Sequence, residues 1–190
     1  MILAVMVGKT WRFINPVDDP AGVVEEILGA LSADASTQVA SSQVASTQVA
    51  ELTFTRKAWQ GHDVDTDNHL FVSVNEETGF GALTWYVMQG WPGEGEKYEE
   101  VWVTDNPDPA DVDPRVVKDP HAGAFYHRRS ALPLDVVRAA LVEYCSTGTG
   151  DRPESVSWTA GRVDGWRQDE PYPARSDAAP EWDPLDNPWG

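Results

Sequence analysis

Three carboxylates alternate along the chain at Asp63, Asp65 and Asp67, which is the spacing of the first oxygen ligands in a calcium-binding loop. The rest of that pattern is missing. Asn68 stands where the sharp-turn glycine belongs, and Val74 stands where a bidentate glutamate should close the cage. The favoured interpretation is a solvated acidic loop that leads into a strand. The alternative is a small metal-dependent enzyme that combines these aspartates with the histidines.

Other residue types that carry chemistry lack the neighbours they need. The histidines show neither the helical spacing of a metalloprotease nor a nearby cysteine pair. They are His62, His69, His121 and His127. No glycine-rich loop follows a strand and opens a helix, and no serine stands in a nucleophile elbow. The single cysteine, Cys145, shares a helical face with Leu134 and Leu141, which predicts a buried thiol. The sequence therefore predicts no catalytic residue, no metal, no cofactor and no enzymatic activity.

The charge of the chain is strongly negative. It has 31 Asp and Glu against 14 Lys and Arg, a formal net charge of −17, which disfavours direct binding to DNA, RNA or an anionic membrane and favours a basic protein partner. The candidate partner-binding residues are Glu76, Glu77, Trp91, Glu94, Glu96, Glu99 and Glu100. We expect Trp91 to be an exposed anchor among the acids. These acids either provide ordinary solubility or imitate nucleic-acid phosphates in the basic cleft of a partner.

Hydrophobic spacing predicts the elements that position these residues. Met1–Val7 lacks the basic start and the length of a signal sequence and predicts a strand, and Asp19 caps a helix whose first residue is Pro20. Further strands are expected over residues 51–56, 69–75, 80–88, 98–103 and 155–158, with a weaker segment at 124–128 and a second helix from residue 134. Asn75–Gly79 suits a hairpin turn. The pattern predicts an α+β fold, an antiparallel sheet of about five or six strands with two main helices packed on one face.

Composition divides the chain near residue 160. We expect one α+β domain over residues 1–160, interrupted at 36–50 by a five-residue repeat that matches neither the helical nor the strand period. This repeat predicts a loop, with a helical extension as the alternative. Residues 161–190 form an acidic tail rich in Pro and Trp. Its tryptophans favour docking on the domain itself over anchoring on a partner, and they are Trp166, Trp182 and Trp189.

The stretch from Ser130 to Trp158 predicts a helix, a tight exit loop and a strand in succession. Its marker residues are Leu132-Pro133-Leu134, Tyr144, Thr147-Gly148, Arg152-Pro153, Val156 and Trp158. With the hairpin segments Leu70–Val74 and Gly81–Tyr86, this pattern resembles the Imm1 immunity-protein family over residues 50–159. The resemblance implies a protein that binds and blocks a toxin encoded beside it, often a nucleic-acid deaminase. It also implies a structural role for Arg152, tying the exit loop to the last helical carbonyls or to a carboxylate.

The resulting hypothesis is a cytoplasmic immunity protein whose acidic surface closes the active site of a cognate toxin with a basic cleft. It would perform no chemistry and would bind neither nucleic acid nor a membrane directly. One alternative is the metal-dependent enzyme, and another is an adaptor that binds a protein through its tail tryptophans. Trp85, Trp102 and Trp158 lie within expected strands and are interpreted as core or sheet-face residues.

Overall fold

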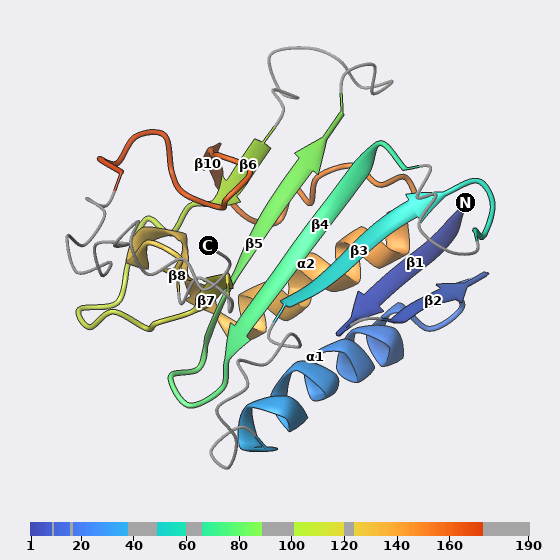
Figure 1. Ribbon diagram of the computed structural model, residues 1–190, viewed down its shortest axis with the longest axis horizontal. Coiled ribbons are helices and arrows are strands. Elements are labelled where there is room, and N and C mark those ends of the chain that lie inside the picture. Colours follow the sequence, from blue (N-terminus) through green and yellow to red (C-terminus); the bar gives the residue numbers. More distant parts are fainter. Residues whose placement is uncertain are drawn as a thin grey trace, which may run out of the picture.

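The computed structural model describes residues 1–8, 10–15, 17–37, 49–59, 66–88, 101–119 and 124–172 (Figure 1). The N-terminal half contains β1 (Ile2–Val7), β2 (Thr10–Ile14), α1 (Pro20–Thr37), β3 (Val49–Thr55), β4 (Asn68–Asn75) and β5 (Phe80–Val87). The C-terminal half contains β6 (Val101–Thr104), β7 (Val117–Asp119), β8 (Ala124–Phe125), a 3-10 turn (Arg128–Ser130), β9 (Leu132–Pro133), α2 (Leu134–Thr147) and β10 (Trp158–Ala160).

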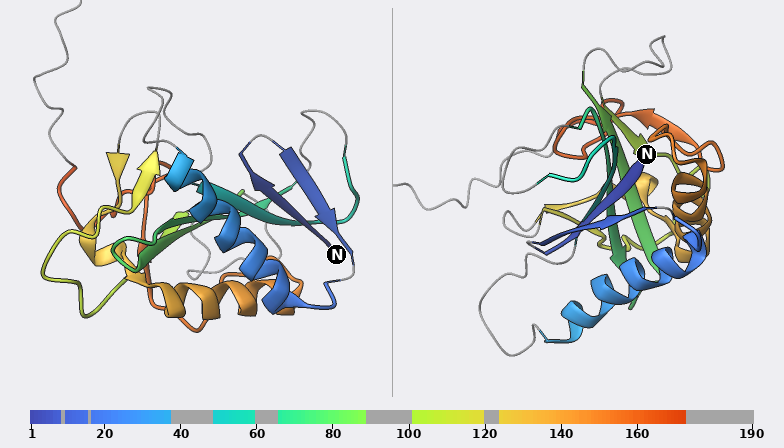
Figure 2. Two further views of the ribbon diagram at one scale, coloured as in Figure 1. Left: turned by 90° about the horizontal axis from the view of Figure 1, so that it is seen from below. Right: turned by 90° about the vertical axis from the view of Figure 1, so that its right-hand side faces the viewer.

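Within the described ranges, the main sheet has eight strands, in the order β10-β6-β5-β4-β3-β1-β2 with β9 added to β5. All of its pairs are antiparallel. Figure 2 shows both helices on the same face of this sheet. The predicted α+β class and its one-sided layering are confirmed. The sheet is larger than predicted because β2 and β9 are short segments whose own spacing is too brief to indicate a strand.

The first helix forms for the reasons that its sequence indicates. The Gly22 N–H donates to Asp19 Oδ1 at 3.0 Å, which satisfies one of the free amides at the helix start. Val24 and Ile27 are buried in the main core against the sheet, and each such side chain contributes about 1.5–3 kcal/mol. Of the loop predicted at residues 36–50, the first two residues belong to α1 and the last two belong to β3. Residues 38–48 lie outside the described ranges.

The second helix ends at a glycine. Gly148 adopts φ +65° as the C-cap, a backbone conformation that favours glycine over residues with a Cβ. Cys145 is 2% exposed in the core beneath α2, which confirms the predicted burial of the thiol. Burial raises the pKa of this thiol to about 12, so it stays protonated at neutral pH.

The strand predicted at residues 155–158 is displaced toward the C-terminus, because β10 spans Trp158–Ala160. The backbone N–H groups of Glu154 and Ser155 donate to the Glu143 carboxylate at 2.7 and 3.0 Å and so do not take part in a strand ladder. Residues 105–119, where the sequence indicates no strand, also contain one, since β7 pairs with β8 in a separate two-stranded sheet. The expected strand start at residue 98 lies outside the described ranges.

One buried carboxamide joins several of these elements. Asn68, at the start of β4, is 0% exposed. Its Nδ2 donates to the Phe54 carbonyl of β3 at 3.0 Å, and its Oδ1 accepts from the Phe54 N–H and from the Tyr144 hydroxyl of α2, each at 3.0 Å. Gly150 packs against the same amide, because a Cβ there would lie 2.7 Å from Asn68 Oδ1. The Gly150 carbonyl accepts from Trp85 Nε1 at 3.1 Å, so β3, β4, β5, α2 and the loop after α2 meet at Asn68.

We expect Asn68→Ala to lower the free energy of unfolding by about 3–4 kcal/mol, because it leaves the Phe54 amide and carbonyl and the Tyr144 hydroxyl without these partners in the core. Tyr144→Phe is the matched variant. It removes one donor but leaves both Phe54 hydrogen bonds, so we expect a loss of about 1 kcal/mol. Urea denaturation followed by tryptophan fluorescence measures both, and equal losses would contradict the joining role of Asn68.

Candidate functional site

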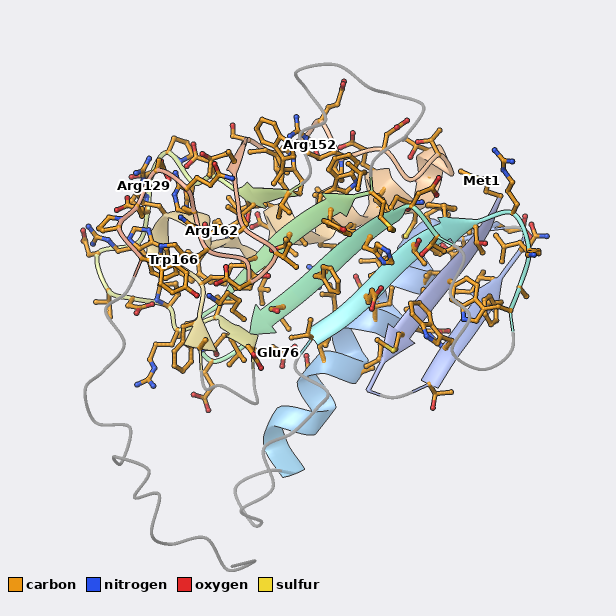
Figure 3. All side chains as sticks on the ribbon, turned by 45° about the horizontal axis from the view of Figure 1, so that its top comes forward. Met1, Glu76, Arg129, Arg152, Arg162 and Trp166 are labelled. Carbon is orange, nitrogen blue, oxygen red and sulfur yellow. The ribbon has the colours of Figure 1, made fainter. Side chains whose placement is uncertain are left out.

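The hairpin between β4 and β5 carries Glu76 and Glu77 at its tip, as predicted, and both residues are exposed. The turn closes through a hydrogen bond from the Gly79 N–H to the Asn75 carbonyl at 3.0 Å. The Glu76 carboxylate accepts a hydrogen bond from the Ser32 hydroxyl of α1. Figure 3 shows Glu76 where β4 ends. Glu76 therefore fixes the tip against the helix, and Glu77 extends the negative charge into solvent.

A second acidic segment lies against this tip. Asn75 Nδ2 and Thr78 Oγ1 both donate to the Pro114 carbonyl, at 2.9 and 3.0 Å, and so hold the end of the loop that precedes β7. This loop exposes Asp111 and Asp113. We call Glu76, Glu77, Asp111 and Asp113 the acidic edge. The sequence shows the acids of both segments, but their proximity depends on hydrogen bonds between residues about forty positions apart.

Five of the predicted contact residues lie outside the described ranges and stay predictions. They are Trp91, Glu94, Glu96, Glu99 and Glu100. His62, Asp63, Asp65 and His121, which belong to the alternative metal site, also lie outside these ranges. Among the described side chains, no group of three or more His, Cys, Asp or Glu residues is placed to hold a metal ion.

His69 lies on the sheet, with both of its ring nitrogens beside polar side chains. Its Nδ1 is 2.6 Å from Glu51 Oε1, and its Nε2 is 3.3 Å from Thr66 Oγ1. The imidazole also stacks near Phe71, with ring centroids 6.2 Å apart. His69 thus belongs to a polar pair within an aromatic surface.

Arg152 lies among three tryptophans at the opposite end of the central strands from Glu76 (Figure 3). Its guanidinium carbon is 4.1 Å from the ring centroid of Trp102, 5.6 Å from that of Trp158 and 6.0 Å from that of Trp85. Trp85 is 0% exposed, and the other two rings pack against the main core. A planar, weakly hydrated guanidinium suits such aromatic surroundings. The sequence indicated a structural role for Arg152 but did not reveal these aromatic partners.

A pocket of about 220 Å³ opens between the end of α2 and the loop that carries Arg152. Three carboxylates help to line it, from Glu143, Asp151 and Glu154. Small-molecule sites typically enclose about 300–1,000 Å³ and are mainly apolar. The Glu143 carboxylate already accepts two backbone hydrogen bonds from the loop. The pocket is therefore poorly suited to a small-molecule ligand.

The first part of the predicted tail packs on the domain. Arg167 is 1% exposed, and its guanidinium donates to both oxygens of Asp169, at 2.8 and 2.7 Å, and to Asp105 Oδ1 at 2.7 Å. The hydrogen bonds from Arg167 hold the pKa of Asp169 below its usual value. Trp166 meets His127 edge to face, with ring centroids 5.7 Å apart. Residues 173–190, which include the other two tail tryptophans, lie outside the described ranges.

Comparison with protein-family models matches residues 22–160 to the family described as immunity protein Imm1. This range contains the whole stretch over which the sequence pattern resembles that family. Comparisons with the curated proteins and with the solved structures gave no match. Neither α1 nor any other helix in the described ranges has the length and apolar character that crossing a membrane requires.

We expect Arg152→Ala to lower the free energy of unfolding by about 2 kcal/mol, because the tryptophan rings lose a partly desolvated cation. Arg152→Lys keeps the charge but not the planar group and should lie between Arg152→Ala and the parent protein. Arg162→Ala is the control, because Arg162 is exposed and lies over Tyr172 at 5.5 Å, and its loss should stay below about 1 kcal/mol. Guanidinium denaturation measures all three, and similar losses for the two alanine variants would refute the tryptophan contribution.

Proposed function

This chain belongs to the Imm1 family of immunity proteins, and we propose that it binds a cognate protein toxin and blocks the active site of that toxin without chemistry of its own. The match of residues 22–160 to the family is the observation that carries this proposal. We further propose that the toxin is a nucleic-acid deaminase with a basic cleft and that the two proteins meet in the cytoplasm. An inhibitory complex of this kind buries about 1,600 Å² in total.

Charge supports the choice of partner. The chain has a formal net charge of −17, and the acidic edge concentrates exposed carboxylates at one end of the sheet. A protein that acts on nucleic acid presents positive charge where the phosphates lie. Complementary charge raises association rates to about 10⁸ M⁻¹s⁻¹ or more at low salt and suppresses binding of wrong partners. The acidic edge would therefore speed the encounter with the toxin and orient it.

Co-expression with the toxin encoded beside this gene tests the proposal directly. We expect growth of a sensitive host to be restored, and the purified proteins to elute as one complex in gel filtration. Toxin activity on nucleic acid should fall in proportion to the amount of added protein until one equivalent is reached. Failure of both rescue and complex formation would rule the proposal out.

The acidic edge can be tested by reversing one charge. We expect Glu77→Lys to slow association with the toxin by about tenfold at low salt, and this effect should shrink in 0.5 M salt as screening increases. Asp18→Lys makes the same change on an exposed residue just before α1, roughly 20 Å along that helix from Ser32, which holds the hairpin tip. It should leave the association rate within about twofold. Stopped-flow mixing at two salt concentrations measures both rates.

Truncation separates toxin neutralisation from the adaptor alternative. Removing residues 173–190 should leave toxin binding intact, because the family match ends at residue 160 and the buried Arg167 network remains. Removing residues 162–190 is the contrasting variant, and we expect it to lower the melting temperature, since Asp105 loses its buried guanidinium partner. Loss of toxin binding on removal of residues 173–190 would favour an adaptor that acts through its tail.

A further inference from the structure

The sheet face opposite the helices is toward the viewer in Figure 1. Strand register places large apolar side chains on it. Because side chains alternate along a strand, Val5 and Leu52 enter the core beneath the helices while Met6 and Glu51 point to the other face. Strand pairing aligns Trp11, Met6, Glu51 and Phe71 in one row, and it places Phe13 beside Ala4 and His69 beside Tyr86. We call this surface the open face.

The open face is unusually apolar for a sheet surface without helices. Antiparallel sheets that face solvent normally present polar side chains there. Here Met6, Trp11, Phe13, Phe71 and Tyr86 are each only partly buried. Across the five strands from β2 to β5 the face spans about 19 Å, at a strand spacing of about 4.8 Å. Partly exposed apolar side chains that gather on one face in this way are characteristic of an interaction surface.

The open face extends at two places beyond the residues that strand pairing aligns. Met88 follows β5 with the same alternation as Tyr86 and is 50% exposed. At the other edge, Trp59 meets Trp11 and Phe13 edge to face, with ring centroids 5.1 and 4.8 Å apart. These rings give the open face the rigid aromatic character that is common at the centre of protein interfaces.

A single carboxylate lies in the middle of these rows. Glu51 Oε1 is 2.6 Å from His69 Nδ1, and His69 is flanked by Phe71 and Tyr86, with ring centroids 6.2 and 5.8 Å away. A carboxylate has two oxygens and can accept further hydrogen bonds through the second one. Aromatic rings attract a cation over their faces, and an adjacent carboxylate pairs with it. This arrangement is chemically suited to an arginine or lysine side chain.

We propose that the open face is the surface on which the toxin docks, and that a basic side chain of the toxin packs beside Phe71 and Tyr86 and pairs with the second carboxylate oxygen of Glu51. This inference rests on the proposed function, because it requires the toxin as a partner. Charge selects the occupant. A second copy of the chain also carries −17 and would bring like charge to the face, and an anionic membrane would be repelled, whereas a basic toxin is attracted.

In this complex, the acidic edge would govern the association rate and the open face would govern the dissociation rate. The acidic edge contains exposed carboxylates at the hairpin tip, which accelerate encounter. The aromatic side chains of the open face desolvate on contact and govern how slowly the complex separates. Substitutions in the open face should therefore change the dissociation rate, whereas those in the acidic edge should change the association rate.

The test measures binding of the full chain to the toxin domain encoded by the neighbouring gene, by biolayer interferometry. We expect Tyr86→Ala to raise the dissociation constant about tenfold or more, mainly through faster dissociation. Glu51→Gln should also weaken binding and reduce its salt dependence. Tyr172→Ala is the matched control, because it removes the same ring from an exposed position in the segment after β10. Its dissociation constant should change by less than about threefold.

Circular dichroism and thermal melting establish that each variant is folded. Phe71→Lys is a second probe that does not depend on the Tyr86 variant, since it keeps an aliphatic stem on the sheet while its charge repels the incoming cation. Unchanged affinity in the Tyr86, Phe71 and Glu51 variants, with the parent chain still neutralising the toxin, would overturn the open face as the docking surface and leave the proposed function standing. A parent chain that neither binds nor neutralises the toxin would overturn both.

Sedimentation of the parent chain tests whether a second copy of the chain, and not the toxin, occupies the open face. If sedimentation shows a dimer of the parent chain that Tyr86→Ala dissociates, and toxin binding is unchanged in that variant, a second copy occupies the open face and the proposal fails. A monomeric parent chain that loses toxin affinity through the same substitution supports it.

Discussion

The fold depends on one buried side-chain amide at the point where β3 and β4 stop pairing. The side-chain amide of Asn68 hydrogen-bonds the N–H and the carbonyl of Phe54 in β3. Without Asn68, these two backbone groups would lack these partners in the core. The amide oxygen also accepts from Tyr144, which ties α2 to the sheet. Buried polar groups are costly unless they are paired. The tight approach of Gly150 follows from this constraint, since a side chain there would meet the amide.

Two arginines have structural roles in a chain that is otherwise strongly acidic. Arg152 lies over tryptophan rings, and Arg167 is buried between Asp105 and Asp169. A guanidinium can do both, because it is planar, weakly hydrated and able to donate in two directions. These arginines fasten the segments that follow α2, and the acidic groups at the hairpin tip stay exposed. The negative surface and the stability of the domain therefore depend on different sets of charges.

The two faces of the sheet suggest how an immunity protein can be rigid and yet have a surface available for binding. Both helices pack on one face and enclose the main core between themselves and the sheet. The other face carries aromatic residues on β2, β4 and β5, which strand pairing holds at fixed positions relative to Met6 of β1 and Glu51 of β3. Side chains held by strand pairing lose little further freedom on binding, so a partner meets a preorganised surface. In the proposed complex, the acidic edge guides approach and the open face provides contact.

The sequence by itself determined the parts of this protein that local patterns encode. The Asp19 cap, the glycine after α2, the hairpin turn and the alternation in β1, β3, β4 and β5 each depend on residues a few positions apart. The family resemblance was visible for the same reason, because its markers are short motifs within these elements.

Only the tertiary structure brought the loop that carries Asp111 to the hairpin that carries Glu77, set Arg152 over three tryptophans and showed which sheet face the helices leave open. β2, which contributes Trp11 and Phe13 to that face, was not predicted because five residues give too little periodicity. The physical reason is the same in each case. Hydrogen bonds and strand register bring these side chains together across long stretches of sequence, and no local pattern specifies which strands will pair.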